Sequence, residues 1–346
     1  MASETSHRVY GTGLLTLDLI LRPGDQEPAR WFAGGTCGNV LVILSFLGWK
    51  SFPITRLNGD IASQIVRHDL EHWGVDLEYA ALAPQVSTPI IVQRIYKNKS
   101  GKVMHRFSCN CPYCGSWLPS FMPVRNDTAI EMSANWKPPT VFFFDRVSRG
   151  MITLARAAAD VGALVVFEPS TKGDFRHMQE ALQIAHIVKY SDQRFPQTLA
   201  AMEVSENTMI EIQTQGSEGF RYRSKFEKRA RNWKKEQSLQ TTIVADSAGA
   251  GDWFTAALIS QFSNGLDDLL ELRTGRLREV LDYANSVAGW SCFFEGARGG
   301  MYEVSKREFP AQIRELQGGH TEVQTCGNKS MTNIDEIDLF PACPAC

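Results

Sequence analysis

Short apolar runs alternate with helix-forming stretches throughout the second half of this chain, and this alternation constrains its fold more than any other feature. Residues 150–161 carry apolar side chains along one helical face, and 175–184 form a second helical stretch. The apolar runs of the buried-strand type are 141–144, 163–167, 186–190, 209–212 and 241–245. Strands that alternate with helices pair in parallel and are covered on both faces. The sequence therefore predicts an α/β fold, in which a doubly wound, mostly parallel sheet lies between layers of helices.

Two further helices and one hairpin complete the predicted organisation. Residues 253–262 and 277–288 have the clearest 3.6-residue apolar rhythm in the chain. Residues 85–108 contain two β-prone runs separated by the polar residues 97–101, which is the pattern of a hairpin. A hairpin before an α/β core predicts a small β element attached to a larger domain. Because no repeat and no low-complexity linker divides the sequence, we expect a single domain over residues 1–346.

Composition and charge exclude several classes of protein. Apolar residues make up 43% of the 346 positions and charged residues 21%, as in a globular rather than a disordered chain. The formal net charge of −2 does not favour binding to nucleic acid through bulk charge. No apolar run approaches the roughly 18–20 residues that span a bilayer, and no secretory signal pattern is present at the start. We expect a cytoplasmic protein with neither a membrane nor a nucleic acid as its partner.

The stretch from Asp246 to Asp252, between an expected strand and an expected helix, carries the most chemical information. Its sequence is DSAGAGD, in which Gly249 and Gly251 allow a tight turn and bring backbone N–H groups close to a ligand. At a helix N-terminus such groups favour negative charge. Asp252 in the first turn would take a proton from a hydroxyl while this anion hole holds a transferring phosphoryl group. The alternative is a helix that begins with an Asp and a glycine-rich approach.

Four blocks in this order resemble the ribokinase-like (PfkB-type) carbohydrate kinases. The sequence GAGDWFTAAL after Asp246-Ser247 is similar to the family's C-terminal signature D-T-x-G-A-G-D-x-F. The block AGGTCGN at 33–39, followed by an apolar helix that ends at Gly48, resembles the family's G-G-x-x-x-N element. The stretch LNGD at 57–60 with HWGVD at 72–76, and TQGSEG at 214–219, match two further family blocks. The resemblance spans residues 11–300, and it implies a ribokinase-like fold and kinase activity.

This resemblance implies a role for each residue of a catalytic and sugar-binding site. Asp252 would be the catalytic base, and the N–H groups of Gly249, Ala250 and Gly251 would form the anion hole. The sugar hydroxyls would be held by Asp18, Gly34, Gly35 and Asn39, because a carboxylate or an amide can bond two neighbouring hydroxyls. Residues about 12–35 and 85–108 would form a small β-sheet lid that closes over the sugar and expels water.

The same resemblance implies the cofactors, which are ATP with Mg²⁺ and a monovalent cation such as K⁺. Thr214, Gly216 and Gly219 would line the ATP site, with Asn285 near the adenine, although Asn285 is equally well explained as a surface residue of its helix. Asp246 and Ser247 would coordinate the monovalent cation. In this family exposed lid sheets often pair between subunits, so the resemblance also implies a homodimer.

The segment that organises Mg²⁺ in relatives departs from the family pattern. Where N-x-x-E is expected, this chain has Ser191 and Arg194, with Asp192 between them. Asp192 could take over the metal, Arg194 could contact phosphate directly, or the site could be weakened. Glu168 replaces an expected Asp after the preceding strand, either as a functional acid or as a cap. Arg146, after the strand that ends at Asp145, either contacts an anionic substrate group or forms a surface ion pair.

Cysteines cluster in two C-P-x-C knuckles at opposite ends of the chain. Cys111 and Cys114 form the first, within the cysteine-rich segment 109–114, and Cys343 and Cys346 form the second in the tail 343–346. Two knuckles supply the four thiolates that structural Zn²⁺ prefers, so we expect zinc to join the segment and the tail. Cys109 is an alternative ligand. Buried thiols without metal, or a redox pair, are the other interpretations.

These features together predict an ATP-dependent kinase that phosphorylates a hydroxymethyl group of a sugar or a sugar-like small molecule. A nucleoside kinase is the near alternative, with Trp31 and Phe32 either stacking on a base or packing the lid. The alternative from another class is a non-catalytic sugar- or nucleotide-binding scaffold that uses its zinc module to engage a partner. The basic stretch 221–235, with interleaved aromatic residues, could bind nucleic acid, but a solvated edge hairpin is the simpler interpretation.

Overall fold

Eight strands form the central sheet of the protein. The computed structural model describes residues 7–21, 30–97, 103–170, 173–195, 205–226, 232–239, 241, 243–323 and 343. The sheet runs in the order β14-β13-β12-β11-β10-β9-β1-β4, and the six strands from β12 to β4 are parallel, whereas β13 and β14 are antiparallel. The strands are β1 (Arg8–Thr12), β4 (Lys50–Pro53), β9 (Val141–Phe144), β10 (Leu164–Phe167), β11 (Ile187–Ser191), β12 (Ile210–Thr214), β13 (Phe220–Ser224) and β14 (Lys234–Glu236). The prediction of a mostly parallel, doubly wound sheet is confirmed.

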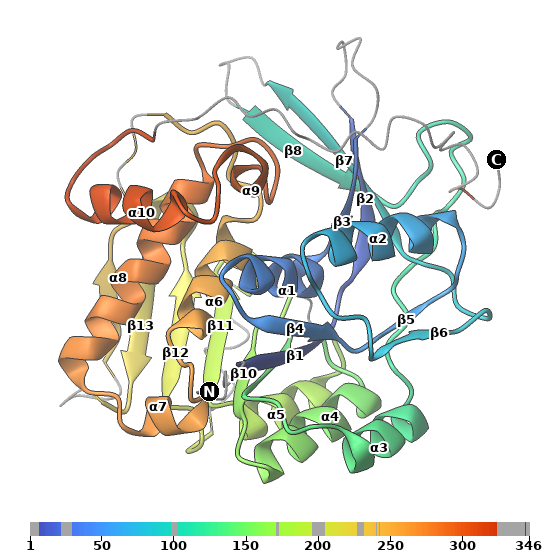
Figure 1. Cartoon of the computed structure of the whole chain (residues 1–346), viewed down its shortest axis with the longest axis horizontal. Helices are drawn as coiled ribbons and strands as arrows, with labels where there is room; N and C mark the ends of the chain where they lie inside the picture. Colours follow the sequence, from blue (N-terminus) through green and yellow to red (C-terminus); the bar gives the residue numbers. More distant parts are fainter. Residues whose placement is uncertain are drawn as a thin grey trace.

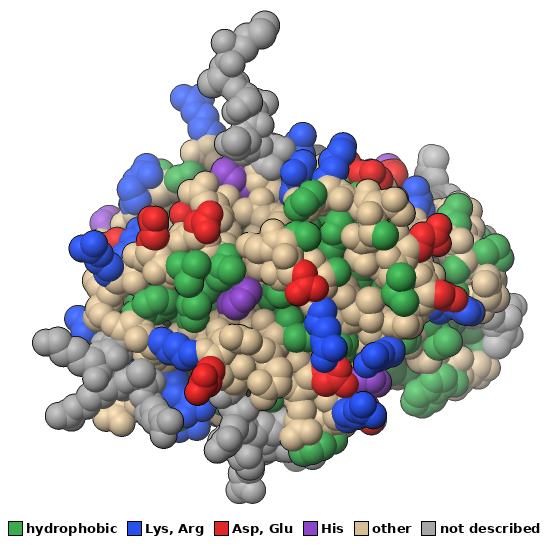
Figure 2. Space-filling view, turned by 90° about the horizontal axis from the view of Figure 1, so that it is seen from below, with side chains coloured by type: hydrophobic (Ala, Val, Ile, Leu, Met, Phe, Trp, Pro, Cys, Tyr) green, Lys and Arg blue, Asp and Glu red, His purple; other side chains and the backbone are tan. Residues whose placement is uncertain are grey.

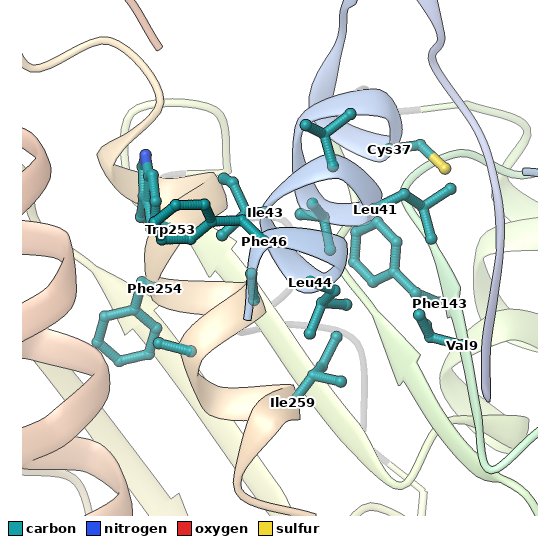
Figure 3. Packing of buried hydrophobic residues seen from close by; sticks show 14 of the residues in the cluster. Val9, Cys37, Leu41, Ile43, Leu44, Phe46, Phe143, Trp253, Phe254 and Ile259 are labelled. Atoms are coloured by element: carbon teal, nitrogen blue, oxygen red, sulfur yellow. The ribbon is translucent and has the colours of Figure 1, made fainter. Parts of the chain in front are cut away.

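Helices cover both faces of this sheet because its strands are apolar on both sides. In β9, Val141 and Phe143 belong to one buried cluster, whereas Phe142 and Phe144 belong to the other. The first face carries α1 (Thr36–Phe46), α6 (Ala250–Ser260), α8 (Thr274–Ser291) and α10 (Phe309–Gln317), and the second carries α3 (Asn126–Asn135), α4 (Arg149–Asp160) and α5 (Phe175–Ile184). Figure 3 shows α1 and α6 packing against each other and the sheet through Leu41, Ile43, Leu44, Phe46, Trp253, Phe254, Ile259, Val9 and Phe143. The predicted helices are therefore present, and α1 and α6 are fixed by a shared core.

A separate four-stranded sheet stands above the carboxyl ends of the central strands (Figure 1). Its order is β3-β2-β7-β8, with β2 (Thr16–Leu21), β3 (Arg30–Gly34), β7 (Ile90–Lys97) and β8 (Val103–Ser108). The strands β7 and β8 pair antiparallel, as the hairpin pattern of 85–108 predicts, and the expected turn residues 98–101 lie outside the described residues. Because β2 pairs in parallel with β7, both predicted segments contribute to one sheet, which we call the lid.

The remaining elements connect the lid to the core and close the C-terminal end. They are β5 (Thr55–Leu57), α2 (Ile61–His72), β6 (Ala80–Leu82), the 3₁₀ turn Gly216–Glu218, α7 (Leu266–Leu270) and α9 (Gly300–Glu303). Asp60, from the LNGD block, begins α2, and its carboxylate accepts a hydrogen bond of 2.7 Å from the Ser63 amide. This block therefore has a structural use as a helix cap.

The strand expected at 241–245 is wrong. The described residues of this segment form no strand, and Ile243 and Val244 are 60% and 58% exposed. The backbone amides of Ala245 and Asp246 instead donate to the carbonyl oxygen of Cys292, at the end of α8. A short β-prone segment, here TTIVA, does not by itself specify a sheet partner. The edge position is taken by β14, a short strand whose lysine-rich sequence suits an exposed edge.

The charged surface agrees with a chain of near-neutral net charge. Figure 2, seen from below the view of Figure 1, shows basic and acidic side chains interspersed with hydrophobic ones. In the basic stretch, Arg221 and Arg223 lie over the Trp233 ring at 4.5 and 5.0 Å, and Arg223 also pairs with Glu211. These contacts belong to an edge hairpin, as the simpler interpretation of that stretch expects. Within the described ranges, no helix has the length and apolar character needed to cross a membrane.

Candidate active site

The N-terminus of α6 lies against Ala297, a residue that lines a pocket beside the lid. The helix begins after Gly249, whose φ of 77° places it in the left-handed region. A Cβ atom at this position would lie 2.4 Å from the carbonyl oxygen of Ala297, so only glycine fits. The Ala250 amide donates to the carbonyl oxygen of Ser247 at 3.3 Å. The first-turn amides of a helix have no partner within the helix, and those of Gly249 and Gly251 are therefore the better placed donors for an anion.

Asp252 lies in the first turn of α6 and contacts the N-terminal glycine block. Its Oδ2 accepts a hydrogen bond of 2.8 Å from Nδ2 of Asn39, a residue 213 positions away in α1. The Asn39 side chain is buried, and its Oδ1 has no hydrogen-bond partner among the described residues. A buried acceptor without a partner costs free energy that a donor on a ligand, such as a hydroxyl group, would recover. Two segments that the sequence analysis assigns to one site are thus in contact.

The pKa of Asp252 is raised to about 7, because burial and the negative charge of Glu168 together outweigh the Asn39 hydrogen bond and the cations Lys189 and Arg194, which lower it. A carboxylate with a pKa near neutrality is a stronger base than an ordinary aspartate and is still largely ionised in weakly alkaline solution. The balance of charges around it suits proton acceptance.

A buried ionic network lies directly beneath the α6 N-terminus. Lys189, within β11, donates to the Glu168 carboxylate and, at 3.0 Å, to the carbonyl oxygen of Gly251. The other Glu168 oxygen accepts from the Thr255 hydroxyl in the second turn of α6. The Lys189 side chain is 2% exposed. Because it bonds both Glu168 and Gly251, Lys189 ties the ends of β10 and β11 to the glycine loop.

Asp18 and Asn39 line a pocket between the lid and α1. Other lining residues are Phe32 and Gln93 of the lid, and Arg298 and Tyr302 from the C-terminal segment. Asp18 accepts from the Thr16 hydroxyl at 2.5 Å, and burial raises its pKa to about 6. Gly34 is not among the described lining residues, but a Cβ atom there would lie 1.9 Å from the Asp18 carboxylate.

Gly35, likewise absent from the described lining, has a φ of 80°, and a Cβ atom there would lie 2.4 Å from the carbonyl oxygen of Leu14. The two glycines therefore make room for Asp18 and the turn behind it. On the opposite side, Arg298 pairs with the buried Asp69 at 2.6 Å and fixes the wall of the pocket.

The residues expected at the nucleotide site gather at the far end of the same sheet edge. Thr214 ends β12, and Gly216 and Gly219 form the turn into β13 with φ values of 58° and 94°. A Cβ atom on Gly219 would lie 2.2 Å from the carbonyl oxygen of Glu236, so the turn packs closely on β14. Asn285 of α8 donates to the carbonyl oxygen of Gln237 at 2.9 Å. The structure thus brings all four predicted residues into one neighbourhood, although Asn285 is already engaged.

The segment that departs from the family pattern lies at the end of β11, beside Asp252. Ser191 ends the strand, and its hydroxyl accepts from the Gln193 amide at 3.2 Å. Asp192 has one buried carboxylate oxygen, Oδ1, without a hydrogen-bond partner in the described part of the chain. Arg194 is exposed, and its charge contributes to lowering the pKa of Asp252. An unpartnered carboxylate oxygen and a guanidinium near the anion hole fit Mg²⁺ and phosphate respectively.

Asp145 and Asp246 are both buried and both hydrogen-bonded by backbone amides. Asp145 accepts from the Leu14 amide at 2.8 Å and so holds the turn between β1 and β2, which is a structural task. Asp246 accepts from the amides of Ala248 and Gly296 at 2.8 and 2.9 Å, and His105 of the lid approaches it to 2.8 Å. Ser247, next to it, is exposed.

Arg146 was expected either to contact an anionic substrate group or to form a surface ion pair. Its guanidinium carbon lies 5.3 Å from the centre of the Phe121 ring.

Three of the four expected zinc ligands lie together below the lid. The Sγ atoms of Cys111, Cys114 and Cys343 are all within 4.8 Å of one another, and those of Cys114 and Cys343 are 3.8 Å apart. Cys109 is not a member of this described group, and Cys346 lies outside the described residues. The first knuckle is a tight turn, in which the Gly115 amide donates to the carbonyl oxygen of Cys111 and Gly115 has a φ of 76°. A cysteine cluster joins the tail to the segment after β8.

Lys189 and His105 are among the residues of this region that the sequence did not single out. Lys189 carries a visible signal, because it is a charged residue inside an otherwise apolar strand, and such a residue requires a buried partner. His105 carries none, since an alternating lid strand contains polar residues at many positions. Glu168, which the sequence allowed either as a functional acid or as a cap, is part of the buried network with Lys189.

Comparison with known proteins gives a consistent result. The sequence pattern of the family described as "pfkB family carbohydrate kinase" matches residues 13–303. An "ATP-dependent ribose-1-phosphate kinase" from Halopiger xanaduensis is 25% identical over 308 residues, which cover 84% of this chain and 94% of the relative. A "probable fructokinase-6, chloroplastic" from Arabidopsis thaliana is 27% identical over 327 residues, covering 86% and 80%. The structure of a Burkholderia thailandensis nucleoside kinase in complex with inosine superimposes with a TM-score of 0.65 at 14% identity, covering 90% and 97%.

Proposed function

This chain belongs to the pfkB family of carbohydrate kinases and is an ATP-dependent sugar kinase, and from that premise we propose that it phosphorylates a hydroxymethyl group of a sugar or nucleoside with Asp252 as the base. The observation that carries the proposal is the hydrogen bond between Asn39 and Asp252. This bond supports the proposal because it joins Asp252, in the first turn of α6, to Asn39, which lines the polar pocket. A substrate hydroxyl group there would lie between a proton acceptor and an anion hole.

The residues of the site divide the reaction between them. The hydroxyl of the substrate would donate its proton to the Asp252 carboxylate as its oxygen attacks the terminal phosphorus of ATP. The bond from that phosphorus to the bridging oxygen would break, and ADP would leave. The amides of Gly249 and Gly251, at the positive end of α6, hold the charge on the transferring group, with a smaller contribution from Ala250. Asp18 and the free acceptor of Asn39 orient the hydroxyl groups, and closure of the lid excludes water. Positioning and electrostatic stabilisation therefore supply the rate.

The phosphates of ATP would lie between the α6 N-terminus and the turn that contains Thr214, Gly216 and Gly219. Asp192 would hold Mg²⁺ through its unpartnered oxygen, and the metal neutralises phosphate charge when it is bound. The guanidinium of Arg194 would contact phosphate directly. On this proposal, Arg194 replaces a carboxylate that organises the metal in relatives with a cation, and Ser191 replaces an asparagine. Neither change abolishes turnover, so the scaffold alternative is disfavoured.

Turnover across a substrate panel tests the activity. We expect ATP consumption with at least one of D-fructose, D-ribose, ribose 1-phosphate and inosine, and its loss in Asp252→Asn. Asp267→Asn is the matched control, because Asp267 is also in a helical first turn, that of α7, but is exposed. A panel without turnover, in a protein that binds a panel member by calorimetry, would favour the scaffold. Preference for inosine over free sugars would make this a nucleoside kinase, with Phe32 of the pocket wall against the base.

We further propose that the cysteine cluster holds one structural Zn²⁺ through Cys111, Cys114, Cys343 and Cys346. Thiolates about 2.3 Å from a tetrahedral zinc ion lie roughly 3.8 Å apart, and the Cys114–Cys343 separation of 3.8 Å has this value. Cys346 would be the fourth ligand because the C-P-A-C spacing repeats that of Cys111 and Cys114. Such a site would fasten the C-terminal tail to the foot of the lid and stabilise the fold.

Elemental analysis of the purified protein tests the zinc site. We expect about one equivalent of zinc in the native chain and in Cys109→Ser, which alters a cysteine outside the described cluster. Cys114→Ser should lose the metal and unfold at a lower temperature. Less than half an equivalent in the native chain, with normal stability of Cys114→Ser, would contradict the proposal.

We also propose that two copies pair through their lid sheets in the cytoplasm. Tyr96 and Phe107 on the lid and Trp117 just after it are 42%, 62% and 71% exposed, and apolar side chains of this size favour an interface. Sedimentation velocity should show a dimer that Phe107→Asp dissociates. Leu270→Asp on α7 is the control, since Leu270 is 56% exposed and remote from the lid. A native monomer would refute the pairing.

A further inference from the structure

A chain of side-chain contacts runs from the substrate pocket to the glycine loop through a histidine of the lid. Gln93 of β7 lines the pocket, and its Nε2 lies 2.9 Å from Nδ1 of His105 on β8. The other ring nitrogen of His105, Nε2, lies 2.8 Å from Oδ1 of Asp246. With the Gln93 amide donating to Nδ1, Nε2 carries the proton and donates to Asp246. The lid is thereby bonded to the segment that leads into α6.

Asp246 is the centre of this chain because it joins three segments at once. Its Oδ1 accepts from the Ala248 amide at 2.8 Å as well as from His105, and its Oδ2 accepts from the Gly296 amide at 2.9 Å. Ala248 immediately precedes Gly249, and Gly296 lies in the pocket wall. The Asp246 side chain is only 2% exposed and that of His105 16%. A small shift of this carboxylate would therefore move both the anion-hole loop and the wall.

The contacts of Asp246 do not fit the monovalent cation that the resemblance places there. A cation binds the lone pairs of a carboxylate, and three N–H donors already occupy three of the about four lone-pair positions of Asp246, including both of those on Oδ1. To reach Oδ1, a cation would have to displace the imidazole ring. Ser247, the other expected ligand, is exposed, and its carbonyl oxygen accepts from the Ala250 amide at 3.3 Å. In this chain, a donor from the lid occupies the position beside the carboxylate.

We propose that His105 is a positioning residue of the kinase, which couples lid closure to the shape of the anion hole by donating to Asp246 in place of a monovalent cation. This inference rests on the proposed function, because it assigns the loop at 246–251 to the transition state. When the lid is closed, His105 fixes Asp246, which in turn holds the Ala248 and Gly296 amides. The enzyme would thus assemble its anion hole only over a covered substrate.

Kinetic analysis of His105→Ala is the first test. We expect kcat to fall about 10–100-fold, since misplacement of a catalytic loop by about 1 Å costs on the order of 100-fold, while KM for the sugar changes less. His105→Gln should recover part of kcat because its amide can still donate to Asp246. His177→Ala is the control, since His177 lies on α5, which Figure 1 shows at the opposite end of the molecule from the lid strands. A kcat within twofold of the native value in His105→Ala would overturn the proposal.

Potassium distinguishes positioning from a general loss of structure. Removal of the imidazole leaves space beside the Asp246 carboxylate, so added KCl should raise both the melting temperature and kcat of His105→Ala relative to tetramethylammonium chloride. The native chain should respond equally to the two salts. Potassium activation of the native chain, or no potassium effect on the variant, would refute the inference. The melting measurement needs no turnover, so it remains informative even if Asp252→Asn proves active and the proposed base is wrong.

Discussion

Replacing Asp252 with asparagine should destroy activity and stabilise the protein at the same time. The side chain is nearly isosteric, and the oxygen of an asparagine can still accept the 2.8 Å hydrogen bond from Asn39. The variant cannot accept a proton, so turnover should fall about 10²–10⁴-fold, which is the usual contribution of a general base. What also disappears is a buried negative charge close to Glu168.

The gain in stability follows from the pKa of Asp252, which is raised from 3.8 to about 7. This rise of about three pKa units makes the charged form less favourable by about 4 kcal/mol, which is an upper limit because Asp252 is only partly buried. Between these two pKa values the folded state binds more protons than the unfolded state. The native protein therefore loses stability as the pH rises from about 4 to about 7, and Asp252→Asn escapes this loss.

Thermal unfolding at several pH values, together with initial rates, measures both effects. Asp252→Asn should melt above the native protein at pH 8, and the difference should shrink towards pH 5. The native kcat/KM should rise with pH through about 7, as the base ionises. An Asp252→Asn variant that melts below the native protein at pH 8 would refute the electrostatic reasoning, and retention of turnover would refute the assignment of the base. Asp267→Asn should show neither effect.

Two further changes test the surroundings of the base. Asn39→Ala removes a hydrogen bond that lowers the pKa of Asp252. The rise of kcat/KM with pH should therefore move about one pH unit higher, which a rate profile from pH 5 to 9 detects. An unchanged profile would contradict this expectation. Lys189→Met leaves the Glu168 carboxylate buried without its cation, and denaturant titration should show a loss of about 3–5 kcal/mol, less in the double variant with Glu168→Gln. Equal stability of Lys189→Met and the native chain would show that the network contributes little.

The architecture was predictable because it depends on local pattern. Runs such as 141–144 are apolar at every position, and a strand with this composition must be buried on both faces. The run at 241–245 is just as apolar over part of its length, yet it forms no strand, because strand formation needs a neighbour with free backbone groups. At that edge the neighbour of β13 is β14. Which strands pair depends on the whole chain, and a segment of five residues does not determine its partner.

The site was predictable only in part, for a related reason. The glycines before Asp252 indicate a helix N-terminus for an anion from local geometry alone. The contact of Asp252 with Asn39 joins residues 213 positions apart, and only the family resemblance placed them in one site. The link from His105 to Asp246 had neither a local signal nor a family block, so the structure was needed to find it.

The charges around Asp252 explain how a departure from the family pattern can be compatible with catalysis. Burial and the charge of Glu168 raise the pKa of Asp252, whereas Lys189 and Arg194 both lower it. A glutamate in place of Arg194 would add a further negative charge near Asp252 in the absence of a metal. The charge of Arg194 instead lowers the pKa of Asp252, and on the proposed function its guanidinium would contact the phosphates of ATP. On this proposal Arg194 acts on both the base and the nucleotide. Its presence therefore favours an active kinase with a different charge arrangement over an inactive relative.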